Sequence, residues 1–232
     1  KEKKVRAISS IFISHFHRDH VSGFADLAAY CSSSGITVEY LITPATLTDK
    51  DWKQIVEGTV GQHADAFTKS IKAILGLPSL SRENSKTFLL HGTYQDRPAK
   101  ECVYSGLHPG LKFVFLSPNP QQVEETIARL ASKKTRENRL VNSLSQAMII
   151  WPESCSEQLL FFPGDLESMP WINLKSRIQK SITHHIDKHF ALFKVPHHGA
   201  TNHKMNKILP QIIPADSALI AVISAPGNEN HP

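Results

Sequence analysis

The stretch Ile11–Gly23, which reads IFISHFHRDHVSG, decides how the rest of the chain is interpreted. Its apolar start is typical of the end of a buried strand. His15 and His17 follow two positions apart, so an extended backbone places them on the same side. Asp19 and His20 come where the chain can turn into a helix. Three imidazoles and a carboxylate packed this closely suit a borderline-soft metal such as zinc, and the alternative is a solvated histidine-rich turn.

The composition indicates a globular α/β chain. It has 232 residues, of which 41% are hydrophobic and 20% charged, enough to build one domain with a substantial core. The formal net charge of +5 is compatible with an anionic substrate, although a solvated basic face explains it equally well. No run of 18 apolar residues is present, so no membrane segment is expected.

The cysteines of the chain do not predict a site, whereas the histidines do. The three cysteines, Cys31, Cys102 and Cys155, are widely spaced and predict neither a disulfide framework nor a cysteine zinc site, which favours a reducing, cytoplasmic compartment. Histidine is abundant, with 13 residues. Most of them gather in two segments and therefore indicate sites: His15, His17, His20, His184, His185, His197, His198 and His203.

Apolar periodicity predicts alternating strands and helices. Strands are expected at 5–14, 36–43, 87–90, 111–116, 146–151, 158–162, 191–195 and 217–224, and helices at 21–33, 48–76, 121–132, 171–189 and 206–209. The strands at 146–151 and 158–162 are joined by a polar turn and predict a hairpin. The second of them runs into Gly164 and Asp165, so a carboxylate is presented at a strand end. The segment 48–86 carries no recognisable chemistry and is expected to be a mostly helical insert.

Taken in order, several motifs resemble those of the metallo-β-lactamase-fold hydrolases, and in particular the hydrolase domain of the ComEC competence proteins. These motifs are SHFHRDH, NSLS, FFPGDLE, FKVPHHGATNH and a terminal ISAPGNENHP. The resemblance covers residues 5–232 apart from the insert. It implies a four-layer αββα fold for residues 1–232, with the family's N-terminal strands expected to be missing, and a nuclease or other phosphodiesterase activity on nucleic acid. Further domains or partner proteins outside the chain are compatible with it.

The resemblance also implies a ligand set for two divalent metal ions. His15 and His17 would bind the first ion, and Asp19 and His20 the second. Asp165 would bridge both ions, and His198 would close the second site, with His197 as the alternative. The family's third motif usually supplies a further histidine to the first ion, but the matching position here is Asn142. Because an amide oxygen or water would fill that gap, zinc remains the expected metal and manganese is the alternative.

The remaining site predictions concern the substrate. Asp19 could orient the nucleophilic water. His197, Thr201 and His231 could contact the phosphate or donate a proton, or simply form loop structure. The basic loop with Lys133, Lys134 and Arg136 could contact a polyanion, or serve as a solvated connector. Two other functions remain open: hydrolysis of a small ester, thioester or lactam, and a non-catalytic metal-binding sensor domain in a larger assembly.

Overall fold

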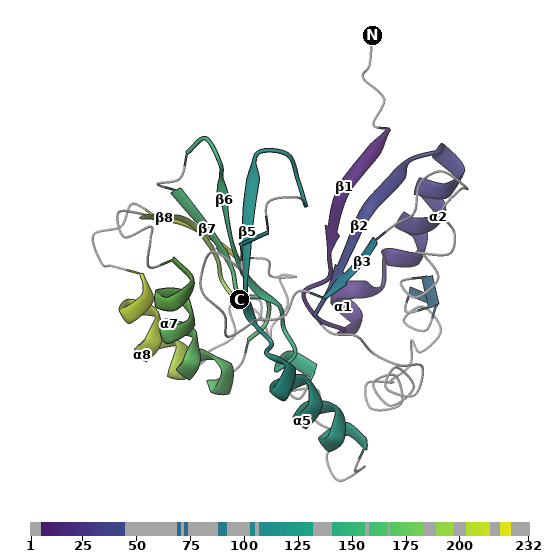
Figure 1. Cartoon of the computed structure of the whole chain (residues 1–232). Coiled ribbons are helices and arrows are strands. Elements are labelled where there is room, and N and C mark those ends of the chain that lie inside the picture. The colour runs from purple at the N-terminus through teal and green to yellow at the C-terminus, as the bar shows by residue number, and fades with distance from the viewer. Residues whose placement is uncertain are drawn as a thin grey trace.

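The computed structural model describes residues 6–44, 69–70, 72–73, 88–91, 103–104, 107–131, 141–155, 158–166, 168–182, 189–196, 203–213 and 219–223. These residues form a mixed α/β structure with two sheets and flanking helices (Figure 1). The predicted α/β class is therefore confirmed. Most of the predicted insert at 48–86 lies outside the described residues.

The first sheet carries the histidine motif at one of its ends. Its three strands are parallel and run in the order β1 (Ala7–Phe12), β2 (Thr37–Thr43) and β3 (Phe88–His91). The short helix α1 (Arg18–Val21) and the helix α2 (Phe24–Ser34) connect β1 to β2, as a parallel pair requires. Gly35 ends α2 in a left-handed conformation (φ +65°), and its N–H donates to the last carbonyls of the helix.

The second sheet has six strands in sequential order. Its strands are β4 (Val103–Tyr104), β5 (Leu111–Ser117), β6 (Ala147–Pro152), β7 (Gln158–Phe162), β8 (His189–Lys194) and β9 (Ile220–Val222). Neighbours are antiparallel as far as β7, so the predicted β6–β7 hairpin is confirmed. The pairs β7–β8 and β8–β9 are parallel. Therefore β7 and β8 have their carboxyl ends at the same edge of the sheet.

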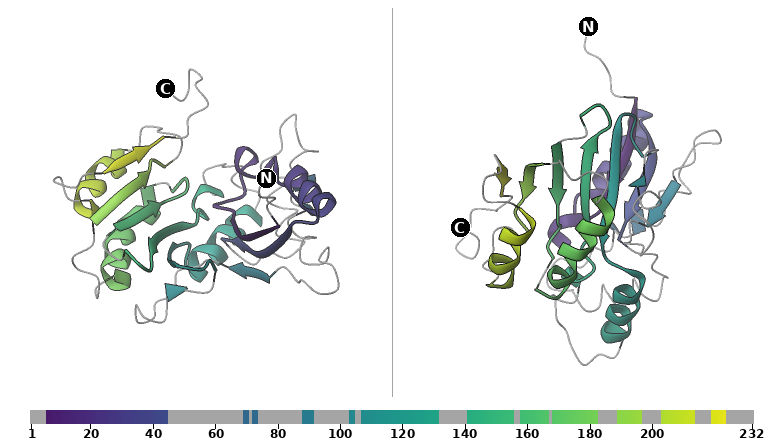
Figure 2. Two further views of the ribbon diagram at one scale, coloured as in Figure 1. Left: turned by 90° about the horizontal axis from the view of Figure 1, so that it is seen from above. Right: turned by 60° about the vertical axis from the view of Figure 1, so that its left-hand side comes forward.

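Helices lie on the outer side of each sheet. Seen from above in Figure 2, α2 is at one side of the molecule, α7 (Ser168–Ile182) and α8 (His203–Ile212) are at the other, and both sheets lie between them. A further helix, α5 (Pro120–Ala131), connects β5 to the segment before β6.

Three apolar clusters fill the spaces between these elements. One joins α2 to the first sheet and includes Phe24, Ala28 and Leu41. A second lies between the sheets, where Phe12 of β1 stacks on Phe113 of β5 with ring centroids 5.3 Å apart. The third packs α7 and α8 against the six-stranded sheet, and its largest members are Trp151, Phe161 and Trp171. Burial of these large side chains is the main source of stability.

The structure corrects two predicted helices. The helix expected at 171–189 is wrong at its end, because α7 is described only as far as Ile182 and His189 is the first residue of β8. The run HFALFK pairs in parallel with β7, and this non-local pairing decides its conformation. The short helix expected at 206–209 is longer, since α8 spans His203–Ile212. Strand β4 was not expected at all.

Two other predictions concern compartment and membrane. Cys31 and Cys155 are free thiols, and Cys102 lies outside the described residues. Within the described part of the chain, no helix combines the length and the apolar character that a membrane crossing requires.

Candidate metal centre

The centre forms where the end of β1 meets the segments next to β6 and β7. Two hydrogen bonds hold these segments together. The backbone N–H of Gln146 donates to the carbonyl of Ser14 (2.6 Å), which ties the histidine motif to the start of β6. The backbone N–H of Asp165 donates to Oγ of Ser145 (3.1 Å), which ties the loop after β7 to the same place. Residues far apart in the sequence are thereby brought side by side.

Gly164 makes this close approach sterically possible. Its φ is +61°, a backbone conformation that residues other than glycine rarely adopt. A Cβ at this position would lie 3.0 Å from Cβ of Ser145 and 3.2 Å from the carbonyl oxygen of Gln146. A glycine before Asp165 therefore allows the carboxylate to be presented directly beside the segment that enters β6.

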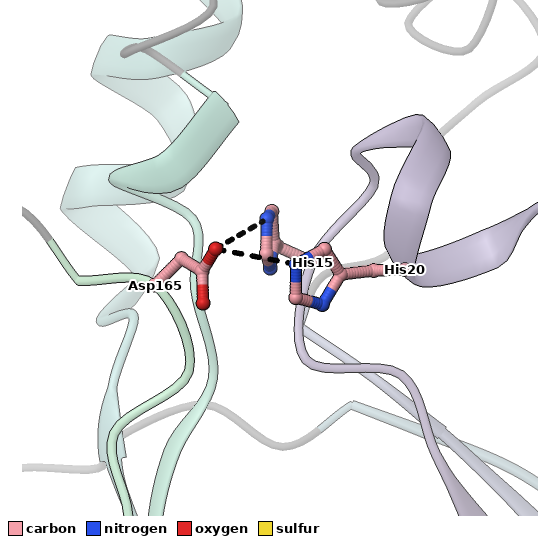
Figure 3. A group of neighbouring side chains, drawn as sticks. All are labelled: His15, His20 and Asp165. Carbon is pink, nitrogen blue, oxygen red and sulfur yellow. Dashed lines mark ion pairs between the residues drawn. The ribbon is translucent and has the colours of Figure 1, made fainter. Parts of the chain in front are cut away.

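His15, His20 and Asp165 converge in this space (Figure 3). Nε2 of His20 lies 3.2 Å from Oδ2 of Asp165, and Nε2 of His15 lies 3.9 Å from the same oxygen. His15 is 0% and Asp165 1% exposed. Ligands about 2.1 Å from a tetrahedral zinc ion stand about 3.4 Å apart, and the ligand atoms of these three residues all lie within 4.8 Å of one another. With two imidazoles and a carboxylate, the group can bind a divalent metal ion.

His17 and Asp19 flank this group. Nδ1 of His17 lies 3.2 Å from Nε2 of His15, as the two-residue spacing predicts. Oδ2 of Asp19 lies 3.4 Å from Nε2 of His20, and the Asp19 side chain is 61% exposed. The structure thus brings five of the six predicted metal ligands into one neighbourhood. Their division between two ions stays a prediction.

Ser14 supports the two central imidazoles. Its Oγ lies 3.1 Å from Nδ1 of His15 and 3.4 Å from Nδ1 of His20. A partner on Nδ1 orients each ring and leaves Nε2 facing Asp165, an arrangement common around metal-binding histidines. Sequence reasoning missed this role of Ser14, although a hydroxyl directly before the first histidine was the available signal.

The electrostatics of the three central groups differ. Burial, together with the neighbouring rings of His20 and His17, lowers the pKa of His15 well below its ordinary value. Burial also tends to lower the pKa of His20, but the contacts with Asp165 and Asp19 outweigh it and raise the pKa to about 9. Burial tends to raise the pKa of Asp165, whereas contact with His20 and the charges of His15, His20 and Lys194 hold it well below its ordinary range. Without metal, the centre therefore pairs an imidazolium with a carboxylate.

Lys194 is the second residue that sequence reasoning missed. As the last residue of β8 it places Nζ 3.6 Å from Oδ1 of Asp165. The parallel pairing of β7 and β8 explains this contact, because the segments after both strands begin at the same edge of the sheet. A lysine ending an otherwise apolar strand, just before a predicted ligand segment, was the signal.

The remaining predicted site residues are Asn142 and seven residues outside the described part of the chain. Asn142 is buried, and its carbonyl accepts a hydrogen bond from the N–H of Ser145, so it belongs to the turn that presents that serine. Its predicted role at the third-motif position stays a prediction. Seven further residues lie outside the described part of the chain, and their predicted roles are unchanged: Lys133, Lys134, Arg136, His197, His198, Thr201 and His231.

Comparisons of the chain with protein-family models, with curated proteins and with solved structures gave no match.

Proposed function

We propose that the chain is a metal-dependent hydrolase with the four-layer αββα metallo-β-lactamase fold, and that it cleaves the phosphodiester bonds of nucleic acid. The observation that carries this proposal is the group formed by the buried His15 and Asp165 and the partly buried His20, with ligand atoms within 4.8 Å of one another. Two sheets contribute to it, so the fold itself creates the donor set.

The arrangement of apolar clusters supports the fold. One cluster lies between α2 and the first sheet, one between the sheets, and one between the second sheet and the helices α7 and α8. This arrangement supports the layer order that the resemblance implies. The donor set also follows the implied order along the chain, with the histidine motif after β1 and the carboxylate after β7.

The chain's own residues would divide the chemistry among them. His15, His20 and Asp165 would hold a metal ion, and His17, Asp19 and His198 would complete the set for two. When bound, divalent ions supply a Lewis acid and an activated water for hydrolysis. Asp19 is exposed beside His20, so its carboxylate can accept a hydrogen bond from the attacking water. In the overall reaction water adds to phosphorus, one P–O bond breaks, and a proton passes to the departing oxygen.

Nucleic acid is favoured as the substrate on electrostatic grounds. The net charge is +5, and the sequence segment containing Lys133, Lys134 and Arg136 is basic. Such groups attract a phosphate backbone by releasing its counterions, whereas a small neutral ester has nothing to gain from them.

The test is metal content by elemental analysis, combined with cleavage assays on single-stranded DNA, RNA and bis(p-nitrophenyl) phosphate with zinc or manganese. His20→Ala and Asp165→Asn should lower turnover by more than about 100-fold, because loss of a ligand should exceed the 10- to 100-fold effect of losing a supporting group. His108→Ala and Asp26→Asn change the same residue types at exposed positions and are the matched controls.

Three outcomes would contradict the proposal. Near-normal turnover and metal content in Asp165→Asn would show that the carboxylate of Asp165 is not a metal ligand. Stoichiometric metal without cleavage of any phosphodiester would favour a metal-binding sensor, and cleavage restricted to esters or lactams would favour the small-molecule hydrolase.

A further inference from the structure

The carboxylate of Asp165 is shared between two kinds of cationic group. Its Oδ2 faces the imidazoles of His15 and His20, as described above, while its Oδ1 faces the ammonium of Lys194 at 3.6 Å. Lys194 therefore pairs with a different oxygen of the carboxylate from the one that the imidazoles face. A positive charge in this position belongs to the centre without being a metal ligand.

The ammonium of Lys194 is not fully committed to Asp165. A charge-assisted N–H···O bond is typically about 2.7–2.9 Å long, so a separation of 3.6 Å is a loose ion pair. The ammonium also donates to the carbonyl of Val195 at 3.3 Å. It carries three protons, and its side chain is 22% exposed, so a ligand in the solvent can reach it.

Charge balance gives this lysine a specific role. Asp19 and Asp165 bring two negative charges to the described cluster. Divalent ions on neutral imidazoles would offset these charges, and Lys194 would add one further positive charge beside Asp165. A positive charge at the edge of the centre attracts an anionic ligand.

We propose that Lys194 binds an anionic oxygen of the substrate, and that it thereby selects phosphodiesters over neutral esters. The proposal rests on the proposed function of the same centre. The competing explanation is that Lys194 only orients the Asp165 carboxylate. The two explanations predict different changes in metal affinity when Lys194 is neutralised. A lysine that orients a ligand strengthens metal binding, so its loss would weaken it. A nearby cation that binds substrate does not strengthen metal binding, so its loss would not.

The experiment compares Lys194→Gln, Lys194→Met, Lys194→Arg and Lys112→Gln with the parent protein. The Met variant keeps the apolar stem and serves as a second neutral substitution if the Gln variant does not fold. Lys112 pairs with Glu153 near the start of β5 and controls for the loss of one surface charge. Calorimetry would measure the Kd of inorganic phosphate for the zinc-loaded proteins, and competition with a chelator would measure zinc affinity. Initial rates on bis(p-nitrophenyl) phosphate and p-nitrophenyl acetate would separate KM from kcat.

The neutral variants should bind phosphate about tenfold more weakly, as expected for loss of one hydrogen bond to a charged group. Their zinc affinity should not fall, and KM should rise for the phosphodiester alone. Lys194→Arg should retain most phosphate binding, and Lys112→Gln should match the parent.

Three results would overturn this role for Lys194. They are unchanged phosphate binding in the neutral variants, no phosphate binding by the zinc-loaded parent, and a tenfold loss of zinc affinity that accounts for the weaker phosphate binding. Phosphate binding is measured without turnover. A parent that cleaves nothing would therefore contradict the proposed hydrolase while leaving Lys194 to be judged by phosphate binding alone.

Discussion

Zinc binding at pH 7 should displace about one proton, and that proton should come from His20. The pKa of His20 is raised to about 9 in the metal-free protein, so its ring is almost fully protonated at pH 7. His15 is already deprotonated and Asp165 already ionised at this pH, because both pKa values are lowered. A metal needs the lone pair on the imidazole, so His20 must lose its proton before it binds.

The size of the effect follows from this pKa. Between pH 7 and pH 8 the apparent zinc affinity should rise about tenfold, or about 1.4 kcal/mol, since one proton competes with the metal. Above pH 9 the affinity should level off, because His20 is then deprotonated before binding. Titration calorimetry in several buffers of different ionisation enthalpy counts the released protons at each pH.

The control is a variant that lacks the carboxylate responsible for the raised pKa of His20. In Asp165→Asn the contact at 3.2 Å loses its negative charge, so the pKa of His20 falls and proton release at pH 7 decreases along with zinc affinity. His108→Ala should behave as the parent. Zero released protons at pH 7, with zinc affinity flat from pH 7 to pH 9, would refute the assignment of a charged His20.

Three further predictions test the centre and the substrate. The raised pKa of His20 stabilises the metal-free fold fully below the unfolded value near 6.5, by about 3 kcal/mol, and this contribution is lost as the pH rises through about 9; equal urea midpoints at pH 6 and pH 10 would contradict it. Gly164→Ala should lower the free energy of unfolding by about 1–3 kcal/mol and weaken zinc binding, because a Cβ meets Ser145 at 3.0 Å and φ is positive; unchanged denaturation and zinc titration curves would count against this packing argument. Turnover on single-stranded DNA should fall steeply from about 50 to 200 mM salt, while turnover on bis(p-nitrophenyl) phosphate changes little, and neutralising the basic residues of 133–139 should flatten the DNA slope; equal slopes for both substrates would argue against nucleic acid.

Local patterns were sufficient for most of the described elements. The apolar run at 158–162 corresponds to β7 without any shift in its bounds, and the predicted helix at 121–132 is α5 within one residue at each end. In both segments the conformation that the local apolar pattern favours is the one that the tertiary structure adopts. The predicted end of the helix at 171–189 was wrong because His189 belongs to β8, which pairs in parallel with β7. A helical pattern of apolar residues carries no information about pairing with a distant strand.

The histidine motif by itself determined that a donor set exists, because its spacing is local and the backbone that carries it is short. The resemblance also assigned Asp165 to this set, but how its carboxylate reaches the histidines, and the presence of Lys194 beside it, needed the tertiary structure. Asp165 reaches His15 and His20 because Gly164 permits a close approach and because Ser14 and the segment entering β6 are hydrogen bonded.

Lys194 reaches Asp165 because β7 and β8 are parallel neighbours whose carboxyl ends lie at one edge of the sheet. Sequence spacing reports the chemistry that a residue brings. Which charges face each other, and therefore their pKa values and the net charge of the centre, depends on distances of a few ångströms that only the packed sheets determine.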